Sequence, residues 1–181
     1  MQYTQDPGSA GLILGALDLW LLGYVEQARR WNERALGLAR EAAHAFTLAY
    51  TLIFSSWLHH FCQEWAIAQE QAEEVIAIAS KQGLALWLAW GMITRGWALA
   101  QQGQGEAGIA EMIQGLAAGR ATGAEICRTY LPTLLVDAYR SVGQPEAGLR
   151  VLGEALAQVE QTEEQYWEAE IYRLKGERCS R

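Results

Sequence analysis

The chain repeats itself every 40 residues, and this period constrains the fold more than any other feature of the sequence. Branched apolar residues recur at that interval, at Leu36, Ile76, Leu116 and Leu156. A second series, mostly glycine, consists of Gly23, Gln63, Gly103 and Gly143. A fixed period between about 20 and 50 residues is typical of a solenoid, in which each unit buries its apolar face against the next. Solenoids present extended surfaces, so the period favours a binding scaffold over an enzyme.

Each 40-residue unit is expected to form two antiparallel helices. In the first unit the second helix covers Val25–Arg40, where Ala28, Trp31, Ala35 and Ala39 form one apolar stripe at helical spacing. Equivalent second helices are expected at about 64–81, 105–120 and 145–160, and first helices at about 9–22, 44–61, 84–102, 124–142 and 163–178. The prediction is one all-α superhelix of nine helices joined by turns of two to four residues. Its units fall at about 4–43, 44–83, 84–123 and 124–163, with a half-unit at 164–181.

The corners and one proline give local predictions. Gly103 and Gly143 follow first helices, where a left-handed residue closes the helix, so both are expected to have positive φ. The second unit has Phe61-Cys62-Gln63-Glu64-Trp65 at this place, which predicts a corner that is longer or packed on aromatic rings. Pro132 is expected to kink the helix over 124–142, because proline removes a hydrogen bond and crowds the preceding turn.

Composition excludes several classes of protein. A length of 181 residues suits one sizeable domain. The 14 basic residues are scattered among 21 acidic ones, and no Lys/Arg run marks a nucleic-acid groove or a contact with an acidic membrane surface. Three widely spaced cysteines fit a reducing compartment. Apolar stretches end before about 18 residues and no leader is present, so we expect a cytoplasmic protein without a membrane span.

Aromatic residues are the best functional lead. They recur in register on the expected first helices, in one column of Tyr50, Trp90 and Tyr130 and another of Trp57 and Trp97. First helices usually line the concave surface of such superhelices, where the rings would meet a peptide or ligand. The alternative is that the rings fill the space between the two helices of a unit. Packing is the favoured interpretation for Trp57 and Trp97, because Gly96 and Ala98 flank Trp97; for the other column both interpretations stay open.

Polar candidates are few. Arg95 and Asp137 lie among apolar residues on first helices, and a structural ion pair is favoured over a ligand contact. His59 and His60 project about 100° apart, which is unsuited to chelation, so contacts with helix-terminal carbonyls are expected in place of a metal site. No nucleophile–base arrangement is recognisable, and we expect no enzyme activity, cofactor or metal. The candidate partner-binding residues are therefore Tyr50, Trp57, Trp90, Trp97, Tyr130 and Asp137.

Several phrases of the chain resemble a known family. They include Ser56-Trp57-Leu58-His59, Arg95-Gly96-Trp97-Ala98-Leu99-Ala100, Arg120-Ala121-Thr122-Gly123-Ala124-Glu125 and Glu168-Ala169-Glu170-Ile171-Tyr172-Arg173-Leu174-Lys175-Gly176-Glu177. The chain resembles the tetratricopeptide-like region of large bacterial signalling proteins that join an adenylate/guanylate cyclase domain, a STAND-type ATPase and C-terminal repeats. Similar repeats occur in LuxR-type regulators related to the maltose-regulon activator. The cyclase and ATPase parts are absent here, including any Gly-x-x-x-x-Gly-Lys-Ser/Thr loop, so those activities do not carry over.

Two functions are consistent with these observations. The first is an interaction module that binds a protein or peptide segment, or the ATPase and cyclase domains of a longer protein. The second is a small-molecule sensor that passes an inducer signal to an effector domain. A discrete pocket between first helices would favour the sensor, and a long open groove the scaffold. The half-unit at 164–181 lacks a second helix, so its apolar face is expected to be covered by a second copy in a homodimer or by later repeats.

Overall fold

The computed structural model describes residues 6–124, 126–127 and 129–162, and in these ranges it contains eight α-helices and no strand. The helices are α1 (Pro7–Leu21), α2 (Val25–Glu41), α3 (Ala45–Phe61), α4 (Trp65–Gln82), α5 (Ala85–Gln101), α6 (Gly105–Ala121), α7 (Leu131–Ser141) and α8 (Pro145–Thr162). The predicted all-α class and antiparallel helix pairs are confirmed. The ninth helix expected at 163–178 lies outside the described residues, as does the face that it was expected to leave open.

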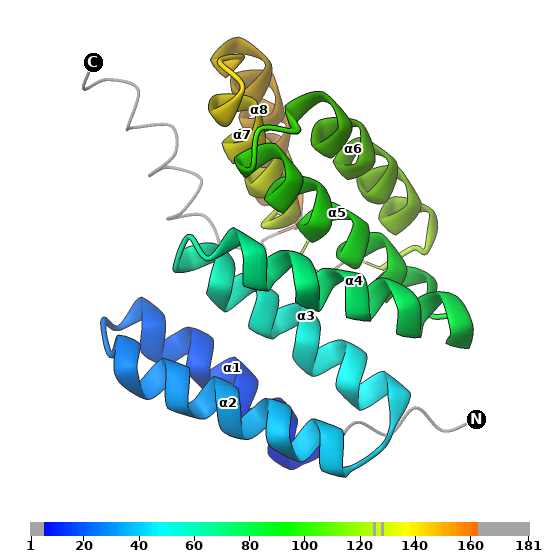
Figure 1. Cartoon of the computed structure of the whole chain (residues 1–181). Coiled ribbons are helices and arrows are strands. Elements are labelled where there is room, and N and C mark those ends of the chain that lie inside the picture. The colour runs from blue at the N-terminus through cyan, green and yellow to red at the C-terminus, as the bar shows by residue number, and fades with distance from the viewer. Residues whose placement is uncertain (1–5, 125, 128, 163–181) are drawn as a thin grey trace.

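The helices stack in sequence order from α1 and α2, blue in Figure 1, to α7 and α8, yellow to orange. The odd-numbered helices contact one another successively, and α2, α4 and α6 each pack on the helix before and the helix after them. The odd helices therefore form a continuous layer that the even helices cover. Helices α3 and α5 lie in the middle of this layer and bury more of their residues than α2, α4 or α6.

Every corner between the described helices contains one member of a series of positive-φ residues spaced 20 apart, and the corner before α7 contains Cys127, with φ of +57°, in addition. The series consists of Gly23, Ala43, Gln63, Gly83, Gly103, Gly123 and Gly143. The predictions for Gly103 and Gly143 are confirmed, with φ of +87° and +73°. The corner at Gln63 is as short as its neighbours, so the expectation of a longer one is wrong. The aromatic alternative is right, because Phe61 stacks on Trp20 with ring centroids 4.7 Å apart.

Helices α5 and α6 approach so closely that their backbones touch. A Cβ placed on Gly96 of α5 would lie 2.5 Å from the carbonyl oxygen of Gly108, closer than real Cβ atoms come to other atoms. The reciprocal Cβ on Gly108 would lie 2.3 Å from the carbonyl oxygen of Gly96. Only a residue without a side chain fits at either place. This contact accounts for two glycines inside helices, where glycine is otherwise unfavourable.

The expected kinked helix over 124–142 is not formed. Helix α7 begins at Leu131 and places Pro132 in its first turn, so the prediction of a kink is wrong. The first turn tolerates proline because its missing N–H would have no partner there, whereas a helix that continued back through 124–130 would place Pro132 in its interior, where the ring crowds the preceding turn. The connection between α6 and α7 consequently spans 122–130, longer than the two to four residues expected. Helix α7 has 11 residues where α5 has 17.

In the part of the chain that the structure describes, no helix combines the length and the apolar character that crossing a lipid bilayer requires.

Candidate functional site

The aromatic columns lie in the core. Trp57, Trp97 and Tyr130 are fully buried and Trp90 is 1% exposed, whereas Tyr50 is half-buried. The alternative of core packing is thus confirmed for Trp57 and Trp97. For Trp90 and Tyr130, where both interpretations were open, the structure shows core packing. In this structure four of the five rings are at most 1% exposed.

Contacts between the rings explain this burial. Trp57 of α3 lies with its ring centroid 5.3 Å from that of Trp90 on α5 and 4.5 Å from that of Tyr130. Tyr130 belongs to the connection that precedes α7, and its hydroxyl lies 3.1 Å from Nδ1 of His60. The connection therefore sends a ring back to α3, 70 residues earlier in the sequence. The space that a peptide would have entered is filled by the chain's own aromatic side chains.

Arg95 and Asp137 do not form the expected pair. Arg95 instead bonds to Glu111 of α6, with Nε 2.9 Å from Oε1. Asp137 Oδ2 accepts from Trp97 Nε1 at 2.8 Å and from Gln101 Nε2 at 3.2 Å. The structural interpretation is right for both residues, but the partners differ. The sequence pattern placed Arg95 and Asp137 in one layer of helices without giving the side of the helix on which each lies.

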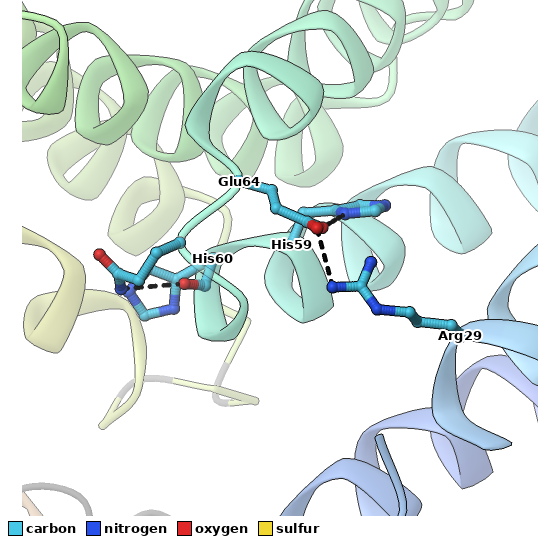
Figure 2. A network of polar contacts seen from close by, with 5 residues as sticks. Arg29, His59, His60 and Glu64 are labelled. Atoms are coloured by element: carbon cyan, nitrogen blue, oxygen red, sulfur yellow. Dashed lines mark hydrogen bonds and ion pairs between the residues drawn. The ribbon is translucent and has the colours of Figure 1, made fainter. Parts of the chain in front are cut away.

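A polar network joins the first two units. Figure 2 shows Glu64 between Arg29 of α2 and His59 of α3, with Glu64 Oε1 2.8 Å from an Arg29 nitrogen and Oε2 2.6 Å from His59 Nδ1. Burial alone would raise the pKa of Glu64, but hydrogen bonds from Arg29 and His59 outweigh it and hold that pKa below its ordinary value. The network is a structural tie between units. Across the described ranges, no group of three or more His, Cys, Asp and Glu side chains is arranged to hold a metal ion.

Two neighbouring cavities open where α7 starts late. The first has a volume of 260 Å³ and lies among α5, α6, the connection and the start of α7; its lining includes Trp90, Ile93, Ile126 and Leu131. The second, of 200 Å³, lies among α6, α7 and α8; its lining includes Ile113, Leu135, Val151 and Glu154. The helical turns expected at 124–130 would have lain beside α5 and α6, where the first cavity is found. Both cavities are lined mainly by apolar side chains.

The cavities share one wall, formed by Leu116, Arg120 and Pro132, which we call the ridge. We call the two cavities together the α6–α7 groove. Two isoleucines in its lining are exposed, Ile126 at 58% and Ile113 at 48%. The aromatic pattern missed this site altogether. A signal was nevertheless present, because Pro132 stood in the middle of an expected helix, where proline is rarely tolerated.

Comparison with known proteins identifies the fold. No family model and no curated protein matches the chain. Two crystal structures of nearly identical TPR-like repeats, from a protein described as a kinesin light chain of Podosopora anserina, are similar to it. They are 17% and 18% identical, with TM-scores of 0.61 and 0.60, and each match covers 97% of this chain and 91% of the other. The chain is therefore an all-α protein with a TPR-like arrangement of antiparallel helices.

Proposed function

We propose that this protein is a non-catalytic interaction module that binds a segment of a partner protein in the α6–α7 groove. TPR-like folds typically serve as surfaces for other proteins and carry no reaction centre. The observation that carries the proposal is the pair of apolar cavities divided by the wall of Leu116, Arg120 and Pro132. Exposed apolar side chains beside such cavities are characteristic of interaction sites.

The sizes of the cavities favour a peptide over a small molecule. Pockets for small molecules usually measure about 300–1,000 Å³, and they bury most of the ligand. The cavities here, of 260 and 200 Å³, each fall below that range, and a ridge of side chains separates them. A peptide satisfies this geometry by inserting one apolar side chain into each cavity while its backbone crosses the ridge. Two buried anchors of this kind supply most of the binding energy in many interfaces.

We also propose that the protein belongs to a larger bacterial signalling assembly in the cytoplasm. The support is the resemblance of its sequence phrases to repeat regions attached to cyclase and STAND-type ATPase domains. Under this proposal the segment bound in the groove comes from such a domain or from a protein that regulates it. The second copy or later repeats expected to cover the half-unit at 164–181 concern residues outside the described ranges.

The sensor function remains the second candidate, and one feature favours it. The first cavity has walls from α5, α6 and α7, so an inducer bound there would contact two successive units and influence their packing. Such a ligand would be a small, largely apolar molecule that fits within 260 Å³. It would leave the second cavity empty, which is why the peptide is the first choice.

Selection of peptides tests the proposal directly. A phage-displayed library of random peptides is selected on the whole immobilised protein, and binding of the enriched peptides is then measured by fluorescence polarisation. The variant Ile126→Arg blocks the groove. Ile67→Arg is the matched control, because Ile67 is an exposed isoleucine of α4 that does not line the groove.

We expect enriched peptides to lose binding to Ile126→Arg and to retain it on Ile67→Arg. Failure to enrich any peptide, or equal binding to both variants, would contradict the proposal. The sensor function is favoured instead if a small-molecule fragment library raises the melting temperature of the wild type and of Ile67→Arg but not of Ile126→Arg.

A further inference from the structure

The ridge of the groove contains a positive charge that pairs with no carboxylate among the described residues. Arg120 lies in the last turn of α6, its side chain is exposed, and it lines both cavities. Three other arginines pair with glutamates: Arg29 with Glu64, Arg40 with Glu74 and Arg95 with Glu111. Within the described residues, the guanidinium of Arg120 forms no such ion pair and no side-chain hydrogen bond.

The position of Arg120 has one structural explanation to be weighed against a binding role. A cation in the last turn of a helix interacts favourably with the helix dipole, and Arg40 and Arg140 occupy comparable positions in α2 and α7. The dipole explains a basic residue near the end of α6. It does not explain why that residue lies on the wall between two apolar cavities, where a neutral side chain would give a continuous apolar surface.

We propose that Arg120 selects the partner by its charge, so that the bound segment carries an aspartate or glutamate between its two apolar anchors. This inference rests on the proposed function. The guanidinium fork matches a carboxylate in geometry and forms short, charge-assisted hydrogen bonds with it. An acidic residue that crosses the ridge would meet Arg120 while the flanking apolar side chains enter the cavities on either side.

The second cavity gives the segment a direction. Glu154 of α8 is the ionisable residue that lines this cavity besides Arg120, and its carboxylate repels an acidic residue placed beyond the second anchor. The acidic position is consequently confined to the ridge, and a basic residue is favoured at the α8 end. The expected partner segment has an acidic centre, an apolar residue on each side of it and no acidic residue beyond the anchor near Glu154.

Charge reversal provides the test. The peptide library is selected in parallel on the wild type, on Arg120→Glu and on Arg34→Glu, a matched control whose arginine is exposed on α2 and does not line the groove. We expect the wild type and Arg34→Glu to enrich Asp or Glu between two apolar residues, and Arg120→Glu to enrich Lys or Arg there. Replacing the acidic residue of a selected peptide by lysine should weaken wild-type binding by about tenfold or more and restore binding to Arg120→Glu.

A second variant keeps the test independent of protein folding. Arg120→Gln retains hydrogen-bond donors without the charge, so it should bind the acidic peptide with an affinity between those of the wild type and Arg120→Glu. Circular dichroism of each variant verifies that the helices are intact. The inference is overturned if selected peptides have no acidic preference, or if they bind Arg120→Glu as tightly as the wild type while still losing binding to Ile126→Arg. In that case peptide binding in the groove stands. If no selected peptide depends on the groove, both proposals fail.

Discussion

Trp97 donates its indole N–H to Asp137 Oδ2 over 2.8 Å, and the two residues occupy the same position in successive 40-residue units. The preceding member of this series is Trp57, whose indole nitrogen is buried without a hydrogen-bond partner among the described residues. The difference follows from the sequence, because the residue 40 positions after Trp57 is another tryptophan and provides no acceptor. The indole–carboxylate hydrogen bond between the third and fourth units thus has no counterpart at the equivalent position between the second and third.

Replacing Asp137 should therefore be costly. Asp137→Ala leaves the indole N–H of fully buried Trp97 unpaired, and we expect the free energy of unfolding to fall by about 1.5–3 kcal/mol. Asp137→Asn keeps an acceptor and should lose less than half of that amount. Urea denaturation measures both. An Asp137→Ala variant as stable as the wild type would show that the link is energetically neutral.

The 40-residue period predicted the helix pairs and the left-handed corner glycines well. A period states which residues are equivalent, and that information suffices where local chemistry decides the structure, as it does at Gly103 and Gly143. It does not state which side of a helix faces the core. Trp90 and Tyr130 would recur every 40 residues whether they lined a groove or filled the interior, so their burial was not predictable from spacing alone.

The α6–α7 groove was missed for a related reason. It arises where the repeat fails, because Pro132 moves the start of α7 to Leu131 and leaves the connection 122–130 outside the helix. Equivalence between units predicted a helix over 124–130, so it could not predict that this segment belongs to the connection. Whether a proline ends a helix depends on the packing of the side chains around it. That packing is visible only in the three-dimensional structure.

Trp90→Ala should behave as a core substitution. The ring is 1% exposed, so its removal is expected to lower the free energy of unfolding by about 3–5 kcal/mol. Trp65→Ala is the comparison, because Trp65 is 41% exposed and should cost distinctly less. Thermal and urea denaturation measure the free energy of unfolding of both variants. Equal losses would mean that Trp90 contributes less packing than its burial implies.

Ala43 offers a route to a more stable protein. It has φ of +50° at a corner where five of the seven equivalent residues are glycine. A left-handed conformation costs a residue with a Cβ about 1–2 kcal/mol, which exceeds the entropy that glycine loses on folding. Ala43→Gly should thus raise the free energy of unfolding by about 0.5–1 kcal/mol. The opposite change, Gly103→Val, should lower it by about 1–2 kcal/mol. A loss of stability in Ala43→Gly would contradict this account.

The close approach of α5 and α6 makes Gly108 irreplaceable. Gly108→Ala would force the two backbones apart, and overpacking of this kind typically costs about 1–3 kcal/mol. Gly37 of α2 is a matched helical glycine with no atom within 4 Å of a built Cβ, so Gly37→Ala should stabilise the protein by about 0.5–1 kcal/mol. Thermal denaturation should show a lower melting temperature for Gly108→Ala and a higher one for Gly37→Ala than for the wild type. A neutral Gly108→Ala would mean that the helices separate at little cost.

Stability should also fall in acid through Glu64. Hydrogen bonds from Arg29 and His59 hold its pKa below the ordinary value of 4.5 in the folded state, despite the opposing effect of burial. A carboxylate with a lowered folded pKa stabilises the protein above its unfolded pKa, and the contribution disappears as the pH falls through the folded value. We expect the stability difference between the wild type and Glu64→Gln to be largest well above pH 4.5 and to shrink as the pH falls below 4.5. Urea denaturation between pH 3 and pH 6 measures this difference. In an Arg29→Gln background this loss of stability in acid should be smaller, because the hydrogen bond from Arg29 that lowers the pKa of Glu64 is gone. The same pH dependence with and without Arg29 would show that the acid sensitivity arises from another group.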